Sequence, residues 1–253
     1  MGTLYVVGTP IGNLEDITLR ALRILREVAV IAAEDTRHAR TLLQAHDLHT
    51  PLTSFHDFTG PAKIRRLVER IEAGEDVALI SDAGMPGISD PGYPLINAAL
   101  AAGCEVTCIP GPSAILVALV LSGLPSHAFR YVGFLPRKPG ERRNFLARLA
   151  EDPDTIICLE SPHRLVATLC DVAATFGADR PIAVARELTK RFEEVLRSNA
   201  GEAIAHFEAT APRGEFTLVL AGRSHREPSR DDSEAHVPQL PSREARAPRA
   251  RRG

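Results

Sequence analysis

The sequence predicts an α/β protein made of two α/β domains, the first with a parallel sheet flanked by helices and the second with a mixed sheet. Two observations carry this prediction. Short apolar strands alternate with helical patterns along residues 4–109, and a second series of strands begins after the break "SGLPSHAF" at 122–129. A chain of 253 residues is long enough for two domains, which we place at 1–124 and 125–222.

The first domain alternates strand and helix regularly. One helix carries its apolar stripe on Ile17, Ala21, Leu25 and Val28, a second carries Ile64, Leu67, Val68 and Ile71 before Gly74, and a third covers Leu95–Ala102. Such strand–helix–strand repetition favours a parallel sheet covered by helices. The expected strands are Leu4–Val7, Val28–Ala33, Leu52–Phe55, Val77–Ile80 and Val106–Ile109.

The second domain repeats the alternation less regularly. Its expected helices are Glu141–Ala150 and Pro162–Phe176. Too few residues separate 182–186 from 192–197 for a helical crossover, so these two strands should pair antiparallel. The expected strands are Tyr131–Leu135, Thr155–Leu159, Ile182–Arg186, Phe192–Arg197 and Phe216–Ala221.

Residues 223–253 differ from the rest in composition. They hold eight arginines and five acidic residues, a net charge of +3, so that residues 1–222 carry −5 of the total of −2. Because this segment has few large apolar residues to bury, we expect a disordered basic tail.

The composition also indicates in which cellular compartment the protein is expected. No apolar run approaches the roughly 20 residues that span a bilayer, and "MGTLYVV" enters a strand at once, without the pattern of a signal peptide. We therefore expect a cytoplasmic protein with no membrane partner. The four cysteines show no paired metal-binding spacing, so we expect buried reduced thiols and no metal.

The loop after the strand at 77–80 is the most unusual stretch of the chain. Residues 81–94, "SDAGMPGISDPGYP", hold three glycines and three prolines. Open α/β sheets bind ligands beyond the carboxyl ends of their strands, and so long a loop is usually functional. No P-loop pattern occurs, and Pro10 stands where a dinucleotide fingerprint needs its second glycine.

Six loop motifs occur together in one order: "LYVVGTPIGNLEDIT", "AAEDTR", "ALISDAGMPGISDPGYPL", "IPGPSA", "GFLPRK" and "LESPHR". Over residues 3–222 they resemble the tetrapyrrole methylase superfamily and, within it, the ribosomal RNA small subunit methyltransferase I branch. The resemblance implies a homodimer with S-adenosylmethionine in the interdomain cleft. It also implies methylation of the ribose 2′-hydroxyl of a decoding-centre cytidine in small-subunit (16S) ribosomal RNA.

Carrying the family motifs over by position implies a set of cofactor-binding residues. In the first domain these are Pro10, Ile11, Asp82, Ala83, Gly84, Ile88, Ser113 and Ala114. Those of the second domain are Leu159, Glu187, Leu188 and Thr217. The start of a helix at Ser113 is chemically suited to the cofactor carboxylate, because helix N-termini favour anions.

A ribose hydroxyl is a weak acid, so a general base should assist the transfer. The candidates are Asp35, beside Glu34 in "AAEDTR", His56 in "SFHD" and Glu160 in "LESPHR". Each has a structural alternative. For Asp35 the alternative is a helix cap or an ion pair with Arg37, for Glu160 it is an ion pair with Arg164, and for His56 it is a hydrogen bond within its loop.

Positive charge gathers at residues 137–148, "RKPGERRNFLAR", where five cations accompany one acid. Arg137, Lys138, Arg142 and Arg143 are the predicted RNA contacts, and a solvated helix face is the alternative. Aromatic residues are sparse here, so we expect an assembled or assembling small subunit as the partner rather than free RNA.

Two other functions stay open: a methylase acting on a tetrapyrrole, and a non-catalytic RNA-binding protein with a nucleotide pocket.

Residues 115–121, "ILVALVL", are apolar on nearly all faces of a helix and must be buried, within the monomer or in a dimer of the first domains.

Overall fold

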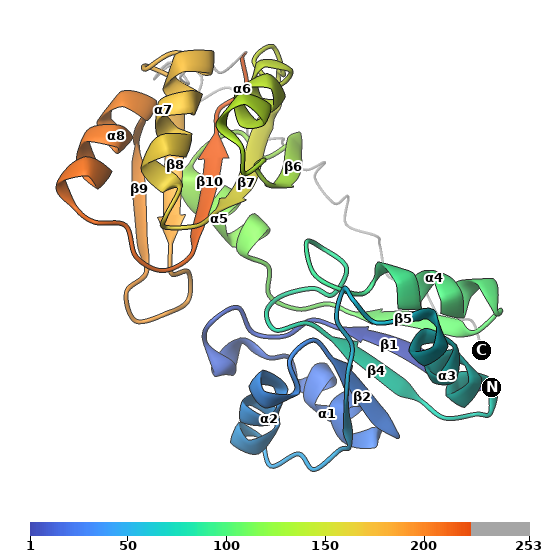
Figure 1. Cartoon of the computed structure of the whole chain (residues 1–253). Helices are drawn as coiled ribbons and strands as arrows, with labels where there is room; N and C mark the ends of the chain where they lie inside the picture. Colours follow the sequence, from blue (N-terminus) through green and yellow to red (C-terminus); the bar gives the residue numbers. More distant parts are fainter. Residues whose placement is uncertain (224–253) are drawn as a thin grey trace, which may run out of the picture.

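The computed structural model describes residues 1–223, so the predicted tail lies outside the described residues apart from Arg223. Two five-stranded sheets, each covered by helices, make up the described chain (Figure 1). No helix among these residues is long and apolar enough to cross a membrane. Within residues 1–223, no group of three or more His, Cys, Asp or Glu side chains is arranged to hold a metal ion.

The first sheet is parallel throughout, as predicted, with the order β3-β2-β4-β1-β5. Its inner strands read as continuous apolar runs because both faces are buried. The strands are β1 (Thr3–Val7), β2 (Val30–Ala33), β3 (Leu52–Ser54), β4 (Val77–Ile80) and β5 (Glu105–Ile109).

Helices cover both faces of this sheet. The apolar sides of α1 (Leu19–Glu27) and α2 (Thr36–Ala45) pack with Val7, Ile31 and Ile80 on one face. Those of α3 (Pro61–Glu72) and α4 (Tyr93–Ala101) pack on the other. A short 3₁₀ helix, η1 (Leu14–Asp16), follows β1. Strand β2 begins at Val30 rather than at the predicted Val28, because Val28 ends α1, where its N–H bonds the carbonyl of Ile24.

The second sheet is mixed, with the order β6-β7-β10-β8-β9, and only β6 and β7 run parallel. Strands β8 and β9 pair antiparallel, which confirms the prediction from their short connection. The strands are β6 (Phe129–Phe134), β7 (Thr155–Glu160), β8 (Pro181–Arg186), β9 (Glu194–Asn199) and β10 (Phe216–Leu220).

One face of the second sheet packs against α6 (Pro139–Ala147), α7 (Leu165–Phe176) and α8 (Ala200–Ala209). Helix α6 starts at Pro139, two residues before the predicted start, since proline suits a first helical turn. Helix α7 starts at Leu165 rather than Pro162, because residues 161–164 form a turn closed by the Arg164 N–H on the Ser161 carbonyl.

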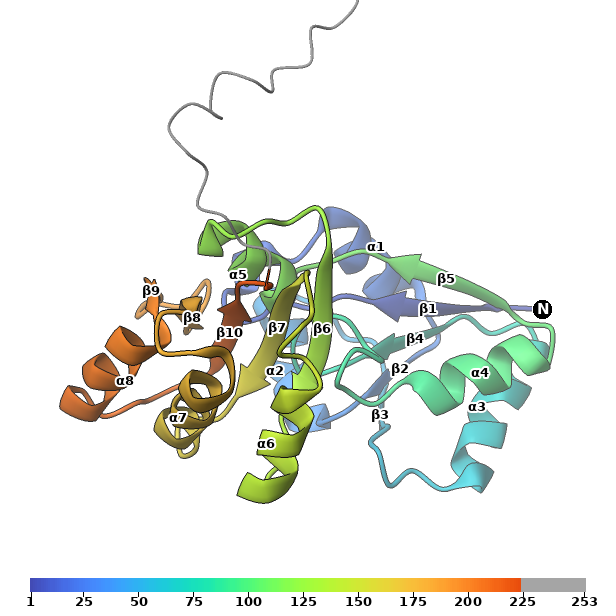
Figure 2. The same ribbon diagram turned by 90° about the horizontal axis from the view of Figure 1, so that it is seen from above.

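The other face of the second sheet is covered by α5 (Ala114–Ser122), which follows directly after the first sheet in the chain. Ala118 and Leu119 of α5 pack with Ile157 and Val219 of the second sheet and with Ile11 of the loop after β1. Both views show α5 beside the second sheet (Figures 1 and 2). One apolar cluster therefore joins the two halves of the molecule.

Two of the four cysteines are buried, Cys104 and Cys158, and all four are free. The prediction of burial is wrong for Cys108 and Cys170, which are exposed. Cys108 lies on β5, the edge strand of the first sheet, and Cys170 lies on α7 next to the buried Leu169.

Candidate functional site

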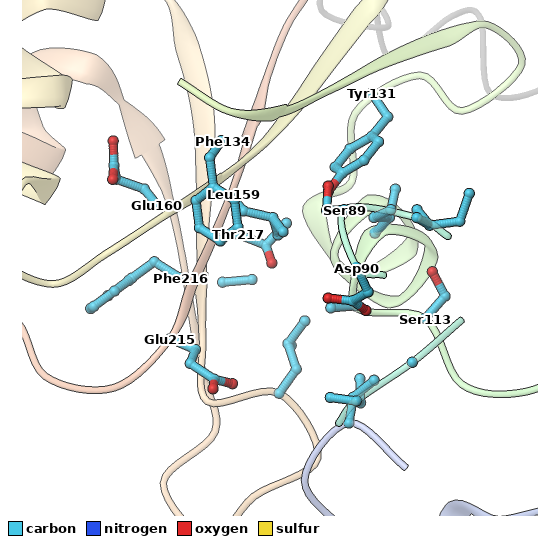
Figure 3. A pocket seen from close by; sticks show the side chains of 18 of the residues that line it. Ser89, Asp90, Ser113, Tyr131, Phe134, Leu159, Glu160, Glu215, Phe216 and Thr217 are labelled. Carbon is cyan, nitrogen blue, oxygen red and sulfur yellow. The ribbon is translucent and has the colours of Figure 1, made fainter. Parts of the chain in front are cut away.

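A cavity of about 430 Å³ lies between the two sheets, within the range of about 300–1,000 Å³ typical of small-molecule sites. One wall comes from loops that follow β1, β4 and β5 of the first sheet. The opposite wall comes from strands β6, β7, β8 and β10, with the loops next to them (Figure 3). Ligand sites are expected beyond the carboxyl ends of parallel strands, and the first sheet places its loops accordingly.

The cavity brings together residues from both predicted groups of cofactor contacts. Its lining includes Ile11, Ala83, Gly84, Ile88, Ser113, Ala114, Leu159, Leu188 and Thr217. The predicted residues Pro10, Asp82 and Glu187 are not part of the lining. The contacts of Asp82 and Glu187 explain why these two side chains lie outside the lining.

Asp82 and Glu187 hold loops behind the cavity surface. The Asp82 carboxylate accepts the N–H of Asp35 at 3.0 Å, and the Asp82 N–H donates to Glu34 at 3.4 Å, which ties the loop after β4 to the loop after β2. Glu187, at φ 49°, accepts the N–H of Glu215 at 3.0 Å and pairs with Lys190 at 3.0 Å. Both carboxylates are therefore engaged in shaping loops that carry lining residues.

The long loop after β4 is fixed at its start by an isolated antiparallel bridge to Thr9. The N–H of Thr9 donates to the Gly84 carbonyl at 2.9 Å, and the Gly84 N–H donates back at 3.1 Å. Gly84 has φ +75°, a conformation that glycine adopts without strain. The bridge holds the backbone of residues 83–84 against the cavity.

Ser113 and Ala114 form the start of α5, and both line the cavity. The Ser113 side chain makes no capping bond to the helix, so the first amides of α5 keep their donors for another acceptor. An α-helix N-terminus of this kind attracts carboxylate or phosphate groups.

A hydrogen bond of 2.6 Å between the hydroxyls of Ser89 and Tyr131 crosses from the loop after β4 to β6. Figure 3 shows the two side chains meeting at one border of the cavity. Ser89 has φ 62°, an uncommon conformation for a residue other than glycine, and such strain concentrates at functional sites. This contact joins the two walls directly.

The predicted catalytic residue Glu160 lines the cavity, but its carboxylate is buried and fully engaged. It accepts the Thr168 hydroxyl at 2.6 Å and the Ser161 N–H at 2.7 Å, and it pairs with Arg164 at 2.6 Å. Figure 3 shows the carboxylate of Glu160 turned away from Asp90 and Ser113. The structure places Glu160 in the support of the loop at 160–164.

The other two predicted bases do not line the cavity. Asp35 caps α2 through the Arg37 N–H at 2.8 Å and pairs with the Arg37 guanidinium at 2.6 Å. These hydrogen bonds hold the pKa of Asp35 well below its ordinary value. His56 is exposed, and its backbone N–H donates to the Thr59 hydroxyl at 2.8 Å. Asp35 therefore has both structural roles that the sequence left open for it, a helix cap and a partner of Arg37.

Asp90 is a lining carboxylate that sequence reasoning missed. Burial and, after it, the carboxylate of Glu34 together raise its pKa to about 6, against a hydrogen bond with Ser81 that lowers it. Burial likewise raises the pKa of Glu34. Figure 3 shows the Asp90 side chain on the first-sheet wall, facing the second sheet. The only sequence signal was its place in the long loop, "GISDPG".

The predicted RNA-binding cations separate into two groups. Arg137, Lys138 and Arg143 are exposed, with Lys138 paired to Glu141 at 2.9 Å. Arg142 is only 3% exposed and is bound to Asp171 of α7 at 2.7 Å. The prediction for Arg142 is therefore corrected: its guanidinium links α6 to α7 and cannot reach a phosphate.

The match to known families agrees with this arrangement of loops around one cavity. A family model described as tetrapyrrole (corrin/porphyrin) methylases matches residues 3–204, and the chain belongs to this family. Within it, the similarity is to proteins named ribosomal RNA small subunit methyltransferase I. The protein of that name from Micromonospora olivasterospora is 50% identical, covering 87% of this chain and 71% of the relative. The one from Thermotoga maritima is 47% identical, covering 88% of this chain and 100% of the relative.

Solved structures show the same fold at lower identity. The uroporphyrin-III C-methyltransferase from Thermus thermophilus, solved in complex with S-adenosyl homocysteine, has a TM-score of 0.60 and 21% identity. The alignment covers 88% of this chain and 98% of that structure.

Proposed function

We propose that this protein transfers a methyl group from S-adenosylmethionine to the ribose 2′-hydroxyl of a decoding-centre cytidine in small-subunit ribosomal RNA. The observation that carries the proposal is the high identity, over nearly the whole described chain, to relatives named for methylation of this RNA. Five of the six loop motifs shared with that branch, all but "AAEDTR", contribute residues to the lining of the cavity between the two sheets.

The residues of the cavity fit the cofactor. Ile11, Ala114, Leu159 and Leu188 offer an apolar surface for an adenosine and a thioether chain, and the amides at the start of α5 offer donors for a carboxylate. When bound, S-adenosylmethionine supplies an activated methyl group on a sulfonium, so the protein contributes mainly position. The two walls, joined by the hydrogen bond between Ser89 and Tyr131, would hold the cofactor and the ribose together in the cavity.

Asp90 is the best placed acceptor for the proton of the ribose hydroxyl. It is the lining carboxylate whose pKa, about 6, lies close to the operating pH, which is where a general base is most effective. Glu160 is held by three partners, and neither Asp35 nor His56 lines the cavity. In this proposal an Asp90 carboxylate oxygen takes the proton as the hydroxyl oxygen gains the methyl group.

In this proposal RNA is the substrate, and the exposed cations that follow β6 bind its phosphates. Arg137, Lys138 and Arg143 follow β6, whose Tyr131 and Phe134 line the cavity. The described chain has few such cations on a body of net negative charge, so we propose an assembled or assembling subunit in the cytoplasm as the partner. We propose no role for a metal or a membrane.

A homodimer is the second part of the proposal. Helix α5 has no polar face, yet Leu116 is 52% exposed and Val120 is 75% exposed. These two residues lie four apart on one side of the helix, and Ala118, which packs on the second sheet, lies on the opposite side. A second copy of the chain would cover them.

The test is a transfer assay with radiolabelled S-adenosylmethionine and three acceptors: unmethylated small ribosomal subunits, free small-subunit RNA and a precorrin-type tetrapyrrole. We expect label on the subunits at the highest rate. Label on the tetrapyrrole alone would favour the small-molecule alternative, and cofactor binding with no transfer to any acceptor would favour a non-catalytic RNA-binding protein.

A further inference from the structure

Strand β6 contains a bulge that changes the direction of one aromatic side chain. Tyr131 pairs with Ile157 of β7, but the next recorded pair is Phe134 with Leu159, so β6 carries one residue more than β7 over this interval. Gly133, at φ +66°, lies inside the bulge. An extra residue reverses the inward and outward alternation of everything that follows it.

The bulge moves Phe134 from the helix side of the sheet to the cavity. Val132 packs in the cluster covered by α6–α8, and regular alternation would send Phe134 to that same face. Paired residues of neighbouring strands share a face, and Leu159, the partner of Phe134, lines the cavity. Phe134 also lines the cavity, and Leu135, instead of Phe134, packs in the cluster covered by α6–α8.

Phe134 is 58% exposed although it lines the cavity. The other two aromatic residues of the lining are committed elsewhere, since Phe216 is 2% exposed and the Tyr131 hydroxyl bonds Ser89. A Cβ at Gly133 would lie 3.5 Å from the Ser89 hydroxyl, so the bulge abuts the long loop. Figure 3 shows Phe134 and Leu159 across from Ser89 and Asp90.

We propose that Phe134 is the stacking platform for the base of the nucleotide whose ribose is methylated, an inference that rests on the proposed function. A nucleotide that places its ribose in the cavity between the two walls leaves the stack of its neighbours, as the target nucleotides of base-modifying enzymes do. Proteins that hold unstacked bases compensate the lost stacking with an aromatic ring. Phe134 presents such a ring at the cavity, and the exposed Arg137, three residues further along the chain, supplies a positive charge that favours the phosphate backbone.

The competing role for the ring is contact with the cofactor. The two roles differ in what a substitution changes. Loss of a base platform lowers turnover with the RNA substrate and leaves cofactor affinity intact, whereas loss of a cofactor contact lowers both. Phe129 offers a matched control, since it is an exposed phenylalanine on the same strand that does not line the cavity.

The experiment compares Phe134→Ala, Phe134→Leu, Phe134→Tyr and Phe129→Ala with the unaltered protein. Methyl transfer to unmethylated small subunits gives kcat and KM, and calorimetric titration with S-adenosyl homocysteine gives cofactor affinity. We expect Phe134→Ala to lower kcat/KM by about 5- to 150-fold, the effect of losing one stacked base. Phe134→Leu should lose nearly as much, Phe134→Tyr should keep most of the activity, and cofactor affinity should stay within about twofold throughout.

Phe129→Ala should retain the unaltered kcat/KM. The inference is overturned if Phe134→Ala keeps its kcat/KM, if Phe134→Leu restores it, or if cofactor affinity falls in proportion to activity. An unaltered protein that transfers no methyl group to the subunits would overturn the proposed function itself, and the inference with it.

Discussion

Replacing Thr168 by valine tests whether Glu160 supports the fold or performs chemistry. The Thr168 hydroxyl donates to the Glu160 carboxylate at 2.6 Å, and both residues are buried. Valine keeps the shape and removes the donor, so one oxygen of a buried carboxylate loses its partner. A hydrogen bond to a charged group contributes about 1.5–3 kcal/mol. For a chain of 253 residues that unfolds as one unit we expect a melting temperature lower by about 3–12 °C.

Thr175→Val on the same helix is the control, because the Thr175 hydroxyl donates only to the Asp171 carbonyl one turn earlier, at 2.8 Å. That bond is local and neutral, and its loss should change stability by less than about 0.5 kcal/mol. Thermal and urea unfolding measure both variants, and the transfer assay at a temperature below both transitions measures kcat. We expect Thr168→Val to keep kcat within about threefold.

The reasoning is refuted if Thr168→Val unfolds like the unaltered protein. It is refuted equally if Glu160→Gln retains full stability and loses activity by about 10²-fold or more, the effect expected of a general base.

Four further predictions concern Asp90, the exposed arginines and helix α5. The methylation rate should rise with pH through about 6 as Asp90 ionises. In the pH–rate profile of Asp90→Asn this rise should be absent. If the rise persists in Asp90→Asn, the ionisation belongs to another group. Because the pKa of Asp90 is raised in the folded state, the contribution of Asp90 to the free energy of unfolding should be full below about pH 4 and lost as pH rises through about 6. Melting curves of the unaltered protein and of Asp90→Asn at several pH values measure this contribution. Arg137→Ala and Arg143→Ala should each lower the slope of log affinity against log salt by about one for subunit binding, and an unchanged slope would remove that arginine from the interface. Val120→Glu should convert a species of twice 27.4 kDa into one of 27.4 kDa by light scattering, and a 27.4 kDa mass for the unaltered protein would contradict the dimer.

Much of the fold could be predicted because its signals are local. Each observed strand overlaps a predicted one, although β9 covers Glu194–Asn199 and not the predicted 192–197, and the short connection after residue 186 indicated the antiparallel pair β8–β9. The cavity could be anticipated because parallel strands bring their following loops to one edge. Helix α8 was missed because Gly201 and several alanines weaken its apolar pattern, although Asn199 and Glu202 form a capping box that the sequence displays.

The missed features of the site depend on contacts between distant segments. Arg142 and Arg143 are adjacent and chemically identical, and both pair with Asp171 of α7, yet only Arg142 is buried in the contact between the two helices. The bulge in β6 exists only in relation to β7, so no pattern within residues 129–134 reveals it. Asp90 acquires its raised pKa from packing and from the carboxylate of Glu34, which is far away in sequence.

The proposed activity is methylation of the ribose of a decoding-centre cytidine in small-subunit ribosomal RNA. The most direct measurement maps 2′-O-methyl groups across small-subunit ribosomal RNA from cells with and without the gene, and from the deletion strain carrying either the unaltered gene or Asp90→Asn. We predict that one cytidine in the decoding centre loses its ribose methyl group in the deletion strain. The unaltered gene should restore that methyl group, and the Asp90→Asn gene should restore it far less. An identical 2′-O-methylation map with and without the gene would contradict the account.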